Sequence, residues 1–151
     1  MTQVILRQSL YESDYLLWTQ ETVAQLRARE FDCIDLENLI EEIEDLGKSR
    51  RNEIRSRLTT LLEHLLKRIY VGIPDCFNGW ENTIRVQRTE IELTLLDSPS
   101  LTTLWDESFD IAFRLALRNV RDEYTKKGFR FPDIWQFSRD IDSMLNINFW
   151  E

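Results

Sequence analysis

Apolar residues recur every three or four positions through residues 35–70, the clearest hydrophobic pattern in the chain. At about 100° per residue the pattern keeps one phase along the segment, which is typical of an amphipathic helix. The positions on this side are Leu36, Leu39, Ile40, Ile43, Ile54, Leu58, Leu61, Leu65 and Ile69. The segment does not alternate as a strand would. We therefore predict a helical segment with one apolar seam from Leu36 to Ile69, which the other helices cover.

Gly47 lies between the two halves of this pattern. A glycine inside a helix costs about 1 kcal/mol relative to alanine, which weakens a helix without ending it. One unbroken helix would be about 50 Å long, whereas a folded chain of this size has a radius of gyration of about 15 Å. We therefore expect a long helix that bends or breaks at Gly47, with a helical hairpin as the alternative.

Further helices are predicted on both sides of this segment. They are a helix from 11 or 14 to 29, helices at about 80–96 and about 99–127, and a short helix capped by Ser138 that reaches about residue 145; residues 71–79 form a loop. Residues 1–9 are expected to be a leading tail, and the aromatic residues of 129–151 to dock on the bundle. The predicted fold class is all-α: one domain over residues 1–151, an irregular bundle of five or six helices around a long central helix or helix pair at 35–70.

The chain is acidic, with a formal net charge of −8 over 151 residues. This charge argues against free nucleic acid or an anionic membrane surface as a partner. No apolar run approaches the roughly 20 residues that span a bilayer, and the first residues lack the basic flank and apolar core of a secretion signal. We therefore expect a cytoplasmic protein. Cys33 and Cys76 do not have metal-binding spacing.

A polar edge follows the apolar seam along the same predicted helix. It carries Glu42, Arg57, His64 and Lys67, and Arg88 of the helix at about 80–96 joins them as a candidate polar site. Histidine and carboxylates are common metal ligands. In a continuous helix, however, Glu42 and His64 would be about 33 Å apart, and the sequence contains no HExxH motif.

Bonds within the fold are the expected role of these polar side chains. We expect His64 to bond a nearby carboxylate or carbonyl, and Glu42 to pair with an arginine such as Arg27 or Arg88. The sequence predicts no metal and no cofactor.

One basic cluster follows Gly47. It consists of Lys48, Arg50, Arg51, Arg55 and Arg57. Such a cluster can contact phosphate, but the surrounding chain is acidic. We expect these side chains to pair with nearby acidic helix faces or with an acidic partner.

An ordered set of motifs spans nearly the whole chain: LENLIEEIEDLG, LLEHLLK, Trp80 with TI three residues on, SPSL and a closing FW. With these motifs the chain resembles the mainly cyanobacterial family catalogued as domain of unknown function twenty-nine, from about Tyr11 to Trp150. The positions that match the family pattern are Asp14, Trp18, Asp35, Asn38, Glu41, Glu42, His64, Lys67, Trp80, Thr83, Arg88, Pro99 and Phe131–Pro132. The chain departs from it near Phe109, where the family tends to carry a tyrosine later in the same helix, and after the final tryptophan, where a proline is missing. The resemblance implies a small all-helical protein and leaves the activity open.

The sequence favours a non-enzymatic interaction protein. It contains no catalytic constellation, neither a GxSxG elbow nor a glycine-rich phosphate loop. The expected partners are another protein or further copies of the chain, as a homo-oligomer. The alternative is an enzyme or metal-binding protein with a polar cleft built on His64, Lys67, a carboxylate and Arg88.

Overall fold

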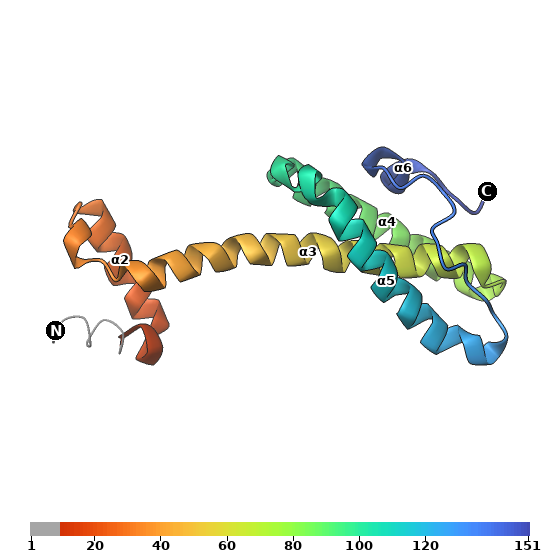
Figure 1. Cartoon of the computed structure of the whole chain (residues 1–151), viewed down its shortest axis with the longest axis horizontal. Helices are drawn as coiled ribbons and strands as arrows, with labels where there is room; N and C mark the ends of the chain where they lie inside the picture. Colours follow the sequence, from red (N-terminus) through yellow and green to blue (C-terminus); the bar gives the residue numbers. More distant parts are fainter. Residues whose placement is uncertain (1–9) are drawn as a thin grey trace. The chain divides into compact units, whose positions relative to one another are not determined.

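The computed structural model describes residues 10–151, and every regular element in that range is a helix (Figure 1). The α-helices are α2 (Tyr15–Arg27), α3 (Leu36–Tyr70), α4 (Pro74–Asp97), α5 (Trp105–Tyr124) and α6 (Ile141–Asn146); the 3₁₀ helices are η1 (Phe31–Cys33), η2 (Pro99–Leu104) and η3 (Thr125–Lys127). The predicted all-α fold class is confirmed. The predicted leading tail, residues 1–9, lies outside the described residues.

The chain divides into two compact units, residues 1–49 and residues 50–151. We call them unit 1 and unit 2. Helix α3 contributes to both, because residues 36–49 belong to unit 1 and residues 50–70 to unit 2. That the whole chain is one domain stays a prediction.

In unit 1, η1 connects α2 to the first part of α3. Asp14 begins α2, since its side chain accepts a hydrogen bond from the backbone N–H of Leu17 at 3.1 Å. This bond satisfies one of the N–H groups that the first turn of a helix leaves without a partner. Beyond α2 the chain turns at Arg29, whose φ of 57° lies in the left-handed region that often follows a helix end.

Unit 1 buries few side chains. Trp18, Thr22 and Ile34 are the buried residues among those described in this unit. The ring of Trp18 packs against Tyr11 and Tyr15, with centroid distances of 4.7 Å and 6.0 Å. Burial of so few apolar side chains contributes little stability to the described part of this unit.

Helix α3 runs unbroken through Gly47. The predicted break at Gly47 and the alternative hairpin are therefore wrong. Ending a helix leaves about four N–H groups and four C=O groups without helical partners, whereas one interior glycine costs only about 1 kcal/mol. The continuous helix therefore has a lower free-energy cost than two separate helices.

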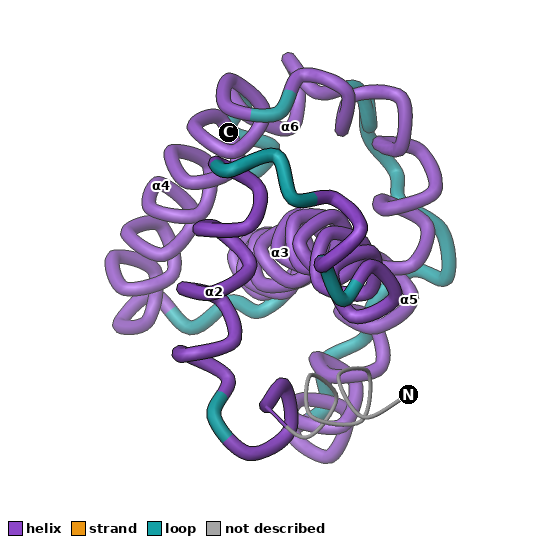
Figure 2. Tube along the Cα trace, turned by 90° about the vertical axis from the view of Figure 1, so that its left-hand side faces the viewer, coloured by secondary structure: helices purple, strands orange, loops and turns teal. Residues whose placement is uncertain are grey.

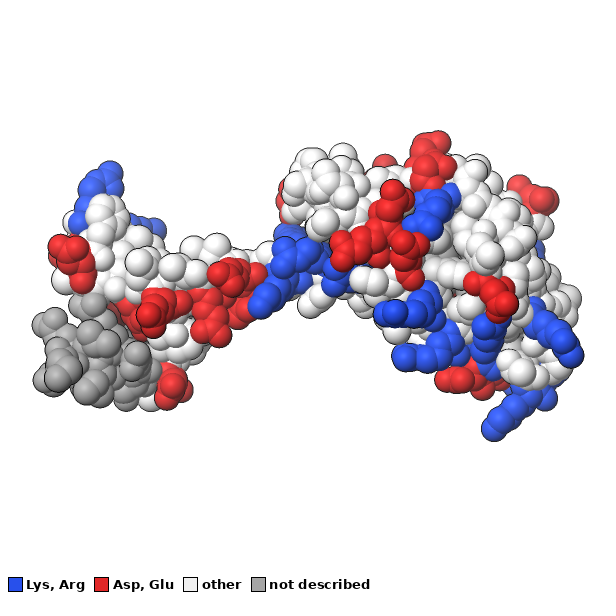
Figure 3. Space-filling model, viewed as in Figure 1, with Lys and Arg blue, Asp and Glu red and all other residues white. Residues whose placement is uncertain are grey.

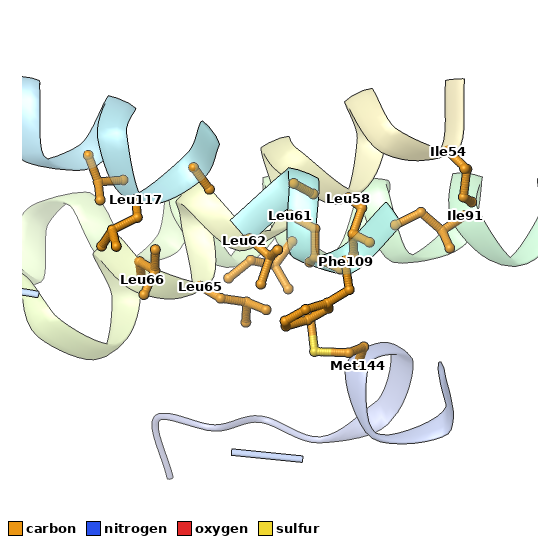
Figure 4. Close-up of a cluster of buried hydrophobic side chains, with 14 of the residues drawn as sticks. Ile54, Leu58, Leu61, Leu62, Leu65, Leu66, Ile91, Phe109, Leu117 and Met144 are labelled. Carbon is orange, nitrogen blue, oxygen red and sulfur yellow. The ribbon is translucent and has the colours of Figure 1, made fainter. Parts of the chain in front are cut away.

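Unit 2 is built around residues 50–70 of α3. Viewed along α3, helices α4 and α5 lie on different sides of it (Figure 2). The side chains of α3 that form the centre of the core are Ile54, Leu58, Leu61, Leu62, Leu65 and Leu66, all essentially without exposed surface. Figure 4 shows them with Ile91 of α4, Phe109 and Leu117 of α5, and Met144 of α6. These contacts bury apolar area, the main favourable contribution to folding.

The segment after α5 packs on the core of unit 2. Gly128 ends η3 with a φ of 90°, a conformation that glycine adopts without a steric penalty. Phe131 is buried, and Trp135, Phe149 and Trp150 are partly buried against the core. The indole Nε1 of Trp105 donates a hydrogen bond to the carbonyl of Arg139 at 2.7 Å.

Two predicted helix starts are wrong, and one predicted helix changes its type along its length. Helix α4 begins at Pro74, within the predicted loop. Proline suits a first helical position, and the guanidinium carbon of Arg68 lies 3.7 Å from the ring centre of Phe77 in the first turn of α4. The predicted long helix at 99–127 keeps its bounds, but it is divided into η2, α5 and η3 in succession. Helix α6 is capped by Asp140, whose carboxylate accepts from the N–H of Ser143, and not by Ser138.

The apolar seam of α3 is buried only in its second half. Leu58 and Leu61 have 0% exposure, whereas Leu36, Ile40 and Ile43 are 59%, 47% and 59% exposed. The prediction that the other helices cover the whole seam is wrong for residues 36–46. Periodicity identifies the apolar side of a helix, but it does not show which part of that side another element covers.

Candidate functional site

Glu42 of α3 lies in unit 1 and binds two tyrosines. The hydroxyls of Tyr11 and Tyr15 both donate to its carboxylate, the latter at 2.5 Å. These two hydrogen bonds lower the pKa of the Glu42 carboxyl group below its ordinary value, and they raise the pKa of both phenols. The prediction that Glu42 pairs with Arg27 or Arg88 is wrong, because the carboxylate accepts from the two tyrosines instead. Glu42 therefore ties Tyr11 and the first turn of α2 to α3.

His64 and Lys67 lie one turn apart on the part of α3 in unit 2. The Nδ1 of His64 donates to the carbonyl of Thr60 at 2.8 Å, a bond within its own helix. Burial lowers the pKa of the imidazole, and the bond to Thr60 opposes that shift. The ammonium of Lys67 lies 3.5 Å from the carboxylate of Glu123 and 5.9 Å from the ring centre of Tyr124. Both side chains thus have partners within the fold.

Arg88 of α4 holds the C-terminal segment. Its guanidinium donates to the carbonyls of Met144, at 2.8 Å, and Ile147, and to the side-chain oxygen of Asn148 at 3.2 Å. The carbonyls lie near the end of α6, where helical C=O groups lack partners. Burial lowers the pKa of Arg88. Arg88 therefore attaches the C-terminal segment to α4.

A pocket of about 360 Å³ opens beside Arg88. Its lining includes Glu81, Arg85 and Glu92 of α4 and Trp150 of the C-terminal segment. His64, Lys67 and Arg57 are not among its lining residues. The pocket therefore does not gather the candidate polar site into one cleft.

Three members of the basic cluster pair with acidic side chains of unit 2. The guanidinium of Arg50 lies 2.7 Å from Asp97, that of Arg55 lies 3.7 Å from Glu107, and that of Arg57 contacts Glu53 and Glu90 at 3.3 Å and 3.6 Å. Lys48 is exposed in unit 1, and Arg51 is half-buried. Pairs of this exposure contribute about 0–1 kcal/mol each, so they orient α3, α4 and α5 more than they stabilise them.

Within residues 10–151, the His, Cys, Asp and Glu side chains do not form a group of three that could hold a metal ion. None of the helices in that range combines the length and apolar character needed to cross a membrane. The cytoplasmic location stays a prediction.

The feature that sequence reasoning missed is an exposed apolar surface on unit 1. It consists of Leu36, Ile40, Ile43 and Leu46 of α3, which are between 47% and 69% exposed; we call it the α3 stripe. Unit 1 holds ten of the sixteen exposed large hydrophobic residues in the described chain, although it is the smaller unit. Large exposed apolar patches are a common feature of protein–protein interaction sites.

One sequence signal distinguishes the stripe from the buried half of the seam. Residues 36–47 contain five acidic residues and no basic residue, whereas basic residues predominate from Lys48 to Arg57. Figure 3 shows the acidic side chains over the first part of α3. The change of charge after Gly47 lies close to the boundary between the units, which follows Ser49.

The model of one protein family matches residues 10–150, and its description is "Domain of unknown function DUF29". This match confirms the resemblance seen in the ordered motifs; the mainly cyanobacterial distribution stays an expectation. Neither a curated protein nor a solved structure matches the chain.

Proposed function

The chain belongs to the family described as "Domain of unknown function DUF29", whose description assigns no activity, and we propose a function from the geometry. In this proposal, unit 1 is a docking module that binds another polypeptide through the α3 stripe. The exposure of this stripe carries the proposal. Four large aliphatic side chains follow each other on one helix face, and each leaves about half or more of its surface in water. Covering such a surface is favourable by about 25 cal/mol per Å² of apolar area.

The small core of unit 1 supports the same function. Only Trp18 and Ile34 are buried hydrophobic residues among those described in this unit. A partner that binds the folded form stabilises it by mass action. Docking on the α3 stripe would therefore also stabilise unit 1.

The polar candidates are consistent with a non-enzymatic role. His64, Lys67 and Arg88 all bond groups of the fold itself. In this proposal they hold unit 2 together, and the α3 stripe is the surface that acts on other molecules.

A matched pair of double variants tests the proposal. Ile43→Ser with Leu46→Ser removes half of the stripe, while Leu93→Ser with Leu96→Ser makes the same kind of change on α4, where the two leucines are 55% and 72% exposed. Each variant is used as bait in native lysate and examined alone by sedimentation velocity. We expect the wild type and the α4 variant to capture a bound protein or to self-associate. The stripe variant should lose this binding or self-association. Identical bound proteins and identical sedimentation for all three would overturn the proposal.

A further inference from the structure

The shape of the α3 stripe suits a helical partner. Its residues recur at intervals of three and four along one helix face, over about 15 Å at 1.5 Å per residue. A partner helix that lies along such a face contacts it with residues at the same i, i+3, i+4 and i+7 spacing. The stripe therefore has room for about three turns of an amphipathic helix.

Acidic side chains border the stripe. At about 100° per residue, Glu37 and Glu44 lie roughly 60° and 40° around the helix from Ile40, and both are exposed. Glu42 borders the opposite side, where Tyr11 and Tyr15 donate to its carboxylate. A helix that packs on the stripe would place its own flanking residues beside these carboxylates.

The net charge of the chain is concentrated in unit 1, which carries the stripe. Unit 1 contains eleven acidic and four basic residues and so carries a net charge of −7, whereas unit 2 contains sixteen and fifteen and carries −1. Nearly all of the net charge of −8 thus belongs to the smaller unit. An approaching cation is attracted to this unit, and an approaching anion is repelled.

We propose that the α3 stripe binds a cationic amphipathic helix of another protein. This inference rests on the docking function proposed above and adds the class of partner. A second copy is a poor occupant, because residues 36–47 contain five carboxylates and no basic residue. Pairing two such segments, parallel or antiparallel, brings acid to acid. A helix with lysine or arginine beside its apolar face forms opposite-charge contacts at the same positions.

The test uses the full chain and two synthetic helical peptides of about four turns. Both peptides have leucine at the stripe-facing positions; one has lysine at the flanking positions and the other has glutamate. Binding is measured by fluorescence anisotropy at low and high salt. We expect the lysine peptide to bind and the glutamate peptide not to bind. High salt should weaken binding, since the screening length falls from about 30 Å at 0.01 M to 3 Å at 1 M.

Matched charge reversals separate the stripe from general attraction to an acidic protein. Glu37→Lys with Glu44→Lys changes the border of the stripe, and Glu92→Lys with Asp122→Lys makes the same change of net charge at exposed positions of unit 2. We expect the first variant to bind the lysine peptide about tenfold more weakly, and the second to change binding less than about threefold. Circular dichroism checks that both variants keep the helical content of the wild type.

The outcomes distinguish this inference from the docking function. Equal binding of both peptides, or equal losses in the two charge-reversal variants, would overturn the cationic partner and leave docking intact. Self-association that Ile43→Ser with Leu46→Ser abolishes, without binding of either peptide, would make a second copy the occupant. If neither peptide binds, and lysate proteins and sedimentation do not depend on the stripe, both proposals fail.

Discussion

Two leucines on α3 test the division of the apolar seam into a buried and an exposed half. Leu61 belongs to the buried part of the seam and Leu46 to the α3 stripe of the same helix; Leu61 is 0% exposed and Leu46 is 69% exposed. The same substitution to alanine at both positions removes the same atoms. The difference between the two results therefore measures the surroundings and not the chemistry of the change.

The expected loss at Leu61 has two contributions. Leu61→Ala removes three buried carbon atoms, worth about 0.8 kcal/mol each, and leaves a cavity among the residues of unit 2. Together these terms reduce the free energy of unfolding by about 2.7–5 kcal/mol. At Leu46 roughly a third of the transfer term applies, and alanine favours the helix slightly, so Leu46→Ala should cost about 0.5 kcal/mol or less.

Urea unfolding followed by far-ultraviolet circular dichroism measures both changes. Because a chain of two compact units need not unfold in a single two-state transition, hydrogen exchange of the α5 amides provides a second measurement, which reports on unit 2. A loss at Leu46 above about 2 kcal/mol would show that residues 36–46 are covered, and the account of the α3 stripe would then be wrong. A loss at Leu61 below about 1 kcal/mol would be equally damaging to the account of the core.

Three further predictions concern polar groups. Arg88→Ala should reduce the free energy of unfolding by about 3 kcal/mol, because charged donors contribute about 1.5–3 kcal/mol per hydrogen bond, and it should speed amide exchange in α6. Arg88→Lys should restore only part of the lost stability, since lysine lacks the planar fork of the guanidinium. Unchanged amide exchange in both variants would contradict the role of Arg88. An NMR titration of His64, the sole histidine, should give a pKa below the usual value of 6.5. Because the unfolded state binds the proton more readily, the contribution of His64 to stability is present above about pH 6.5 and is lost as the pH falls from there through the folded-state pKa. A measured pKa at or above 6.5 would refute the burial of the imidazole. The Glu42 pKa is lowered, so the contribution of this carboxylate to stability is present above about pH 4.5 and is lost as the pH falls through the folded-state pKa. Tyr11→Phe with Tyr15→Phe should return the Glu42 pKa toward 4.5, as measured by carboxyl NMR. An unchanged Glu42 pKa would show that the tyrosines do not bind the carboxylate.

Much of the fold follows from local pattern. The helical period from Leu36 to Ile69, the start of α2 near Asp14 and the stop at Gly128 are all visible in the sequence, and all occur in the structure. These features depend on residues within a few positions of each other. The all-α class follows from them because each helix forms its hydrogen bonds internally.

The start of α4 shows where local signals fail. Gly72, Pro74 and Gly79 favour a loop, yet α4 begins at Pro74 and includes Gly79. The rings of Phe77 and Trp80, 6.1 Å apart, lie against the core of unit 2. Tertiary packing outweighs the roughly 1 kcal/mol that an interior glycine costs.

The candidate polar residues were identifiable by type, but their partners were not. Arg88 binds carbonyls 56 and 59 positions later in the chain, and no spacing rule connects such distant positions. Glu42 binds Tyr11 and Tyr15 across the connection between α2 and α3. Both sets of contacts exist only after the helices pack.

The sequence by itself determined that α3 is helical, which of its sides is apolar, and that its first half is acidic, because these properties belong to residues within one or two turns. Only the tertiary structure decided that Leu58 and Leu61 are core residues while Leu36 and Ile43 face water. Burial depends on which other helices reach a given stretch, and α4, α5 and α6 pack on residues of α3 beyond position 50. The same hydrophobic period therefore forms a core in unit 2 and an exposed stripe in unit 1.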